Sequence, residues 1–332
     1  MSTPPGLPDP ADKDALLAWL QTRRRKAVGN SPVHTLSELD SAQRKRLRQA
    51  LNDGPLAQPV GSEPSRRPVL RFALDGPPVQ KHRVESAVLG DWLKAFQTAV
   101  QSVAYALDEL RPTNDSGPVP KAIQRATKLY SGPAFASSYG MVLEGTSVQN
   151  QEELPVFGNS DGLLDRAINR ILDVTDRADS GPGAEDSVLD MTLPLGRRAI
   201  SHLSELSDVL AATGADVTLT WQSLSTVSRT SRLSSAGADR CRRVLRAAEV
   251  EEHRDRLLGT VVGGSKLRGV IEIEVAGQGV VVIRTLKEKV TAFLGAYAER
   301  QVAADVHVLT ARSPLGREHH SYLLLDLSLH ED

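Results

Sequence analysis

At 332 residues the chain is longer than one compact core usually becomes, so its length predicts two or three domains. The formal net charge of −1 excludes a strong overall attraction to nucleic acid or to an anionic membrane, and the single cysteine, Cys241, excludes an internal disulfide and an all-cysteine zinc site. With no apolar run of membrane-spanning length and no secretion signal at its N-terminus, the chain is expected to be cytoplasmic.

Residues 1–60 are predicted to form a helical arm behind a disordered, proline-rich N-terminus. Leucines at helical spacing, followed or surrounded by arginine and lysine, predict one helix over residues 12–28 and a second over residues 41–52. Two such helices bury too little surface to be stable alone. The arm should therefore dock on the rest of the chain or hold a partner.

A proline- and glycine-rich linker, residues 53–67, precedes a mixed α+β domain predicted over residues 66–250. Apolar residues at helical spacing predict long helices, and alternation of apolar and polar residues predicts strands between them. The predicted helices are residues 85–110, 161–177, 196–212 and 236–248. The predicted strands are residues 69–74, 127–131, 139–144, 216–222 and 227–233.

Residues 253–332 are predicted to form a small barrel that follows a charged connector over residues 249–256. Three apolar runs, residues 257–262, 269–275 and 279–284, are separated by glycine-rich breaks at residues 263–265 and 276–278. Thr285 and Glu288 have the spacing of a capping box at the start of a helix. Strands over residues 302–311 and 321–329 complete the order strand, strand, strand, helix, strand, strand. This is the order of the OB-fold, a five-stranded Greek-key barrel.

The predicted fold class is therefore α+β, with an N-terminal helical arm, a central mixed α+β domain and a C-terminal small OB-like β-barrel. OB-folds usually bind ligands on the face of the second and third strands, between the first-to-second and fourth-to-fifth loops. Cationic side chains occupy both loops, and the candidate nucleic-acid or partner-binding residues are Lys266, Arg268, Arg312, Arg317, His319 and His320. Against nucleic acid, the second and third strands carry Glu272 and Glu274 and no aromatic residue on which a base could stack.

No motif in the chain identifies catalytic residues, a metal site or a cofactor. The histidines are scattered, and none has another four residues away, as a helical zinc site requires. Cys241 lies among arginines that could make its thiol reactive, although packing against the helix's neighbours is the simpler interpretation. The arginines of residues 240–246 form a second basic cluster that nucleic acid could use.

Two parts of the sequence resemble uncharacterised proteins encoded in bacterial mobile-element and phage-defence loci. The first is the run Leu129-Tyr130-Ser131-Gly132-Pro133-Ala134-Phe135 before a strand, and the second is the closing barrel from Leu257 to Leu329. The resemblance implies a role in antiviral defence and carries no catalytic residues with it.

The sequence is therefore interpreted as a non-catalytic binding or assembly protein, a subunit of a bacterial defence system that holds partner proteins, or a second copy of itself, through its arm and barrel. One alternative is an OB-type nucleic-acid-binding protein. A second alternative is an enzyme whose site is assembled from residues that are distant in the sequence.

Overall fold

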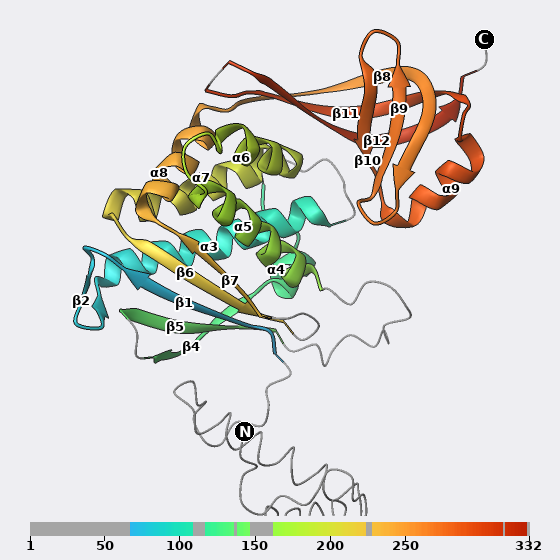
Figure 1. Ribbon diagram of the computed structural model, residues 1–332. Helices are drawn as coiled ribbons and strands as arrows, with labels where there is room; N and C mark the ends of the chain where they lie inside the picture. The colour runs from blue at the N-terminus through green and yellow to red at the C-terminus, as the bar shows by residue number, and fades with distance from the viewer. Residues whose placement is uncertain are drawn as a thin grey trace, which may run out of the picture. The chain divides into compact units, whose positions relative to one another are not determined.

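The computed structural model describes residues 67–108, 117–135, 138–146, 162–223, 228–314 and 316–330 (Figure 1). By its contacts the chain divides into two units, residues 1–65 and 66–332, and every described residue lies in the second unit. The predicted arm, residues 1–60, lies outside the described residues. No helix in the described ranges is long and apolar enough to cross a membrane.

A five-stranded antiparallel sheet forms the base of the central part, with strand order β4-β5-β1-β6-β7. Its strands are β1 (Val69–Asp75), β4 (Leu129–Phe135), β5 (Tyr139–Gly145), β6 (Asp216–Gln222) and β7 (Arg229–Leu233). In β1, Leu70, Phe72 and Leu74 are buried while the residues between them are not, as the alternation predicts. A short hairpin, β2 (Val79–Gln80) and β3 (Arg83–Val84), follows β1 and was not predicted.

Helices pack on one face of this sheet (Figure 1). They are α3 (Ser86–Leu107), α4 (Lys121–Ala126), α5 (Leu163–Asp179), α6 (Glu185–Thr192), the 3-10 helix η2 (Leu193–Leu195), α7 (Gly196–Thr213) and α8 (Ser235–Ala247). The predicted stripe of α3 is confirmed at Trp92 and Phe96, which stack with ring centroids 5.0 Å apart and join a core with Phe72 of the sheet. Sequence periodicity missed α4 and α6, which are only six and eight residues long.

The C-terminal part is a sheet of five strands closed into a ring, in the order β10-β12-β11-β8-β9. The strands are β8 (Glu249–Ser265), β9 (Val270–Val275), β10 (Gly279–Arg284), β11 (Gln301–Arg312) and β12 (Glu318–Leu329). All their pairings are antiparallel except that of β10 with β12. The ring encloses its own apolar core, which includes Ile271, Ile273, Ile283 and Val306.

Strand β8 corrects two predictions made from the sequence. The charged connector over residues 249–256 is the first half of β8 and pairs with β11 residue by residue. The glycine-rich segment at residues 263–265 is not a break before a new strand. It forms the last three residues of β8, which continues through Gly263 and Gly264 after a bulge. A side chain on Gly264 would meet the carbonyl oxygen of Val270 at 2.8 Å, so glycine permits close strand pairing here instead of ending the strand.

The first half of β8 joins the ring to the central helices. Val250 of β8 and Leu309 and Ala311 of β11 belong to the central core, whereas Val306 and Val308 of β11 belong to the core of the ring. The division into domains at residues 66–250 and 253–332 therefore stays a prediction, because residues 66–332 form one compact unit that contains two apolar cores.

The predicted capping box at Thr285 is wrong. Helix α9 (Lys287–Tyr297) begins after Leu286, and no side chain caps its first turn. Thr285 is instead buried, and its backbone N–H donates to the carbonyl of Gly269 at 2.8 Å. Thr285 therefore continues the pairing of β10 with β9 by one residue beyond Arg284.

Candidate functional site

The six candidate residues fall into two groups at opposite ends of β8. Lys266 directly follows the last residue of β8, whereas Arg312 pairs with its first residue, Glu249. Seventeen residues separate these ends, which at about 3.3 Å per residue is a path of roughly 55 Å along the strand. That both loops border one groove stays a prediction, and the length of β8, whose first half reaches the central core, does not support it.

The β11–β12 turn is docked on helix α6, and its cations are occupied there. Arg317 lies 3.0 Å from Asp186, and His319 Nδ1 lies 2.6 Å from Asp190. His319 Nε2 also lies 3.5 Å from Asp186, and the His319 side chain is only 10% exposed. We call these residues the docked turn. These contacts fasten the hairpin to helix α6, although the side chain of Arg317 stays 75% exposed.

Asp186 is the centre of the docked turn. Burial disfavours its ionised form, but a hydrogen bond from Ser313 and the charges of Arg317 and His319 outweigh that effect. The pKa of Asp186 consequently lies below its ordinary value of 3.8. The carboxylate is therefore charged at neutral pH, as an ion pair with Arg317 requires.

The two remaining residues of the β11–β12 hairpin pair within it. Arg312 meets Glu318 across the strands at 2.7 Å. His320 Nδ1 lies 3.2 Å from the hydroxyl of Thr310, and its ring stacks on Tyr322 with centroids 6.2 Å apart. These contacts hold the hairpin's own register, so neither residue is directed toward the β8–β9 turn.

In the β8–β9 turn, Lys266 has no ion pair within the described residues. Its neighbour Arg268 lies 3.2 Å from Glu272 of β9, and Leu267 between them is 85% exposed. The turn therefore presents to solvent one unpaired lysine, one leucine and one arginine that is paired with Glu272. That is much less positive charge than a backbone-tracking nucleic-acid groove needs.

The second basic cluster, on helix α8, is neutralised by carboxylates. Arg242 pairs with both Asp208 and Asp239, Arg243 pairs with Asp239, and Arg246 pairs with Asp208. Arg240 donates to the carbonyl oxygen of Ala178 instead. These arginines connect α8 to its neighbouring helices, so they do not form the basic patch that the sequence suggested.

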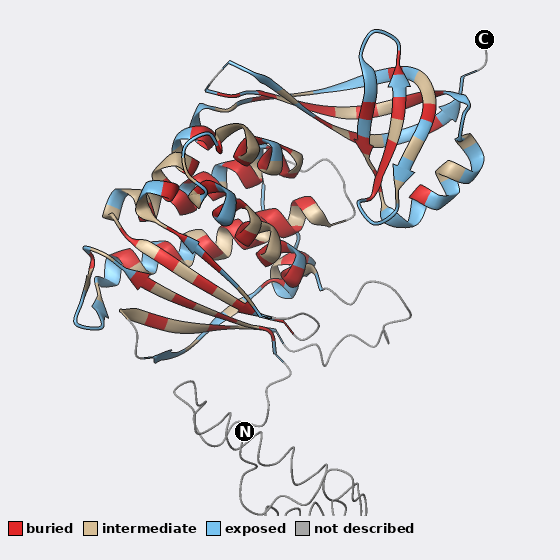
Figure 2. Ribbon diagram, viewed as in Figure 1, coloured by how far each residue is buried: buried red, intermediate tan, exposed pale blue. Residues whose placement is uncertain are grey.

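The largest exposed apolar surface of the ring lies on the outward side of β8, β9 and β10. Leu258, Val262, Val280 and Val282 are between 45% and 55% exposed, although each belongs to a strand (Figure 2). Glu274 lies opposite Val280, and Glu272 lies opposite Val282. We call these six residues the outer face. It combines aliphatic side chains of β8 and β10 with two carboxylates of β9, and so spans the first three strands of the ring.

Sequence reasoning missed the outer face, although a signal was present. The run Gly279-Val280-Val281-Val282-Ile283 is apolar at every position, whereas an antiparallel strand with one solvated face alternates. Because Val281 and Ile283 fill the core of the ring, Val280 and Val282 must point outward. When such a strand carries apolar side chains on both its inward and its outward side, another molecule can cover the outward side.

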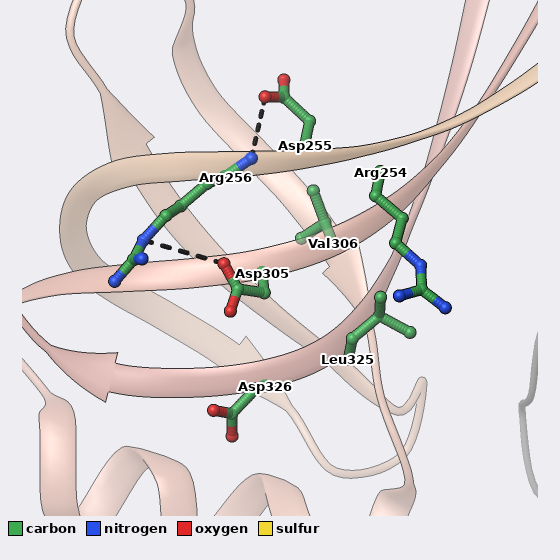
Figure 3. Close-up of a pocket in the computed structure, with 7 residues that line it drawn as sticks. All are labelled: Arg254, Asp255, Arg256, Asp305, Val306, Leu325 and Asp326. Carbon is green, nitrogen blue, oxygen red and sulfur yellow. Dashed lines mark hydrogen bonds and ion pairs between the residues drawn. The ribbon is translucent and has the colours of Figure 1, made fainter.

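A separate depression of about 490 Å³ lies where β12 bulges at Leu325, opposite Asp305 and Val306 of β11. Figure 3 shows its lining residues, which are Arg254, Asp255, Arg256, Asp305, Val306, Leu325 and Asp326. Arg256 reaches toward Asp305, and the two are 3.7 Å apart. Two arginines and three aspartates leave the lining without a strong field of either sign, so it selects neither an anion nor a cation.

Comparison with protein-family models, with curated proteins and with solved structures finds no match.

Cys241 is a packing residue. Its side chain is buried in the central core, and burial raises the pKa of the thiol to about 11, against a smaller lowering by a hydrogen bond with Ser207. The interpretation of Cys241 as a reactive thiolate is therefore wrong. Within the described ranges, no group of three or more His, Cys, Asp or Glu side chains is placed to hold a metal ion.

Proposed function

We propose that the protein is a binding protein of the bacterial cytoplasm and that its C-terminal ring, an OB-like barrel, holds a partner protein. The strand order supports the OB-like assignment. If the strands are numbered in chain order, they follow one another around the ring as first, second, third, fifth and fourth. Helix α9 lies in the chain between the third and fourth strands. In OB-folds the second and third strands carry the ligand, and here those strands are β9 and β10 of the outer face.

The exposed outer face is the observation that carries this proposal. Four exposed aliphatic side chains on β8 and β10, the two strands that flank β9, are unfavourable in water, and a partner that covered them would gain roughly 25 cal/mol for each square ångström of apolar surface buried. Because β8, β9 and β10 are paired within a closed ring, a partner must lie across their side chains and cannot add a strand to them.

The charge of the outer face defines the partner further. Glu274 stands beside Val280 and has no ion pair among the described residues, whereas Glu272, beside Val282, already pairs with Arg268, so an aliphatic segment that carries a lysine or arginine opposite Glu274 is complementary to the outer face. A second copy of this chain is disfavoured on the same ground, since face-to-face pairing would bring the Glu274 carboxylates of both copies into one interface. Glu274 also repels the phosphates of nucleic acid. The resemblance to proteins of phage-defence loci supports defence as the setting in which the partner is met.

The test uses the full chain and three labelled probes, read by fluorescence anisotropy. The probes are a peptide that alternates valine with lysine, a matched peptide that alternates valine with glutamate, and a single-stranded oligothymidylate. We expect the valine–lysine peptide to bind most tightly and to weaken as salt is raised. A change of both Val280→Ser and Val282→Ser should weaken it at least tenfold, whereas Leu329→Ser, a similarly exposed control at the end of β12, should not.

Two results would count against the proposal. Equal binding of the two peptides would remove the charge argument, and tighter binding of the oligonucleotide would favour the nucleic-acid alternative. In the second case the Lys266→Ala and Arg268→Ala double variant should lose the oligonucleotide. Light scattering on the same samples distinguishes either result from self-association.

A further inference from the structure

The central sheet has one face that no described helix covers (Figure 1). Alternate residues of β1 point into the helical core, so Arg71 between them points to the other side of the sheet. Residues that pair side by side across a sheet point to the same face. We call this side the open face, and the residues that the pairing of β4, β5, β1, β6 and β7 places on it include Arg71, Tyr130, Phe135, Val142, Thr220 and Thr230.

Two aromatic side chains stand exposed on the open face. Tyr130 is 46% exposed and Phe135 is 37% exposed, and outside the C-terminal ring they are the only large apolar side chains of the described residues with such exposure. Phe135 lies over Gly140 of β5, where a Cβ atom would be 2.3 Å from the aromatic group. Glycine at this position therefore lets Phe135 lie against the sheet while part of it faces solvent.

The spacing of the two aromatic side chains suits two separate flat ligand groups. Tyr130 is paired with Glu144 and Phe135 with Gly140, so four residues of β5 separate the two positions. At about 3.4 Å per residue this is roughly 13 Å along the strand. The two groups are too far apart to stack on each other, and each can accept its own planar partner.

Positive charge lies beside these aromatic side chains. Arg71, on the middle strand of the sheet, is partly buried and has no ion pair with a described residue. Lys128 Nζ lies 5.0 Å from the centre of the Tyr130 aromatic group. The one carboxylate of β4 and β5, Glu144, is already paired with Arg67 at 3.3 Å. This half of the open face is therefore complementary to an anionic ligand that also carries planar groups.

We propose that the open face binds single-stranded RNA. Unpaired bases stack on Tyr130 and Phe135, and a double helix does not offer its bases for such stacking. Arg71 binds a phosphate of the strand. On the other half of the face, the hydroxyls of Thr220 and Thr230 lie 3.0 Å apart and can bond the 2′-hydroxyl that distinguishes RNA from DNA. The proposal is independent of the outer face, which belongs to the C-terminal ring and takes a protein.

The test is fluorescence anisotropy of the full chain with a short labelled oligouridylate. The same strand as deoxyuridylate, and the RNA annealed to oligoadenylate, are the matched probes. We expect the single-stranded RNA to bind most tightly. Tyr130→Leu and Phe135→Leu should each weaken it at least tenfold, because leucine is apolar but offers no flat surface to a base. Tyr130→Phe, which keeps the aromatic group, should bind within twofold of the unchanged protein.

The role of Arg71 has its own measurement. Arg71→Gln should weaken RNA binding at least fivefold and make it less dependent on salt, because one phosphate contact is lost. Arg83→Gln, a change of an exposed arginine in β3, should leave binding within twofold. The valine–lysine peptide should not displace the RNA, since the two ligands use different surfaces.

Four results would overturn the proposal. They are no binding of the oligouridylate, equally tight binding of the deoxyuridylate, unchanged binding in both leucine variants, and tighter binding of the valine–glutamate peptide at the open face. Thermal unfolding of each variant separates a lost stacking surface from a lost fold. If Phe135→Leu does not fold, Tyr130→Leu, on a more exposed side chain, decides the matter alone.

Discussion

The contact between Asp165 and Trp221 decides how helix α5 sits on the sheet. Trp221 of β6 is 1% exposed, and its Nε1–H donates to the Asp165 carboxylate at 2.5 Å. Asp165→Ala leaves that buried donor without a partner, which costs about 1–3 kcal/mol. Asp165→Asn keeps an acceptor and should cost much less. Urea unfolding measures both, with Asp91→Ala on the exposed side of α3 as the control. Equal losses for the two Asp165 variants would contradict this role of the hydrogen bond.

At Cys241 the pKa of about 11 predicts how the folded protein reacts. At pH 8 about one thiol in a thousand would be ionised, and the buried sulfur is closed to reagents. Iodoacetamide should therefore leave the folded chain unmodified and label it fully in urea. Mass spectrometry of the intact protein reads the result. Rapid stoichiometric labelling of the folded chain would show that the thiol is accessible.

Among the elements, the docking of the β11–β12 hairpin on helix α6 should depend on pH. Because the pKa of Asp186 in the folded chain lies below 3.8, its carboxylate stabilises the fold above about pH 4. This contribution is lost as the pH falls through the folded-state pKa. Arg317 is 75% exposed, so the effect should stay below about 1 kcal/mol.

The measurement for this effect is urea unfolding of the unchanged protein and of Asp186→Asn at pH 7 and at pH 3. The variant should be less stable at pH 7, and the difference should be smaller at pH 3, where protonation of Asp186 is favoured more than at pH 7. A difference of the same size at both pH values would mean that Asp186 acts through packing and not through its charge.

The pairing of β8 with β9 depends on Gly259. A Cβ atom at this position would lie 2.3 Å from the carbonyl oxygen of Glu274 and 2.8 Å from the side chain of Ile273. Gly259→Ala must push the strands apart and should destabilise the protein by about 1–3 kcal/mol in urea unfolding. Gly295 in α9 has open space around it, so Gly295→Ala should instead stabilise by roughly 0.5–1 kcal/mol. A neutral Gly259→Ala would contradict the tight pairing.

Elements with strong periodicity could be predicted from the sequence, and those set by distant contacts could not. The stripe of Trp92, Phe96 and Val100 identified α3, and the order of the last five strands was predicted correctly. The first half of β8 was missed because its charged side chains hide a strand that is fixed by pairing with β11. The docked turn was missed because Arg317 meets Asp186, a residue 131 positions away, on a helix too short for periodicity to reveal.

For the molecule as a whole, the central claim is that a basic, aliphatic segment of a partner protein lies across the outer face. Hydrogen exchange of the full chain, with and without the valine–lysine peptide, tests this claim most directly. We predict slower exchange in β9 and β10, residues 270–284, and unchanged exchange in the β11–β12 turn, residues 313–317. Slower exchange in that turn with none in β9 and β10 would contradict the account.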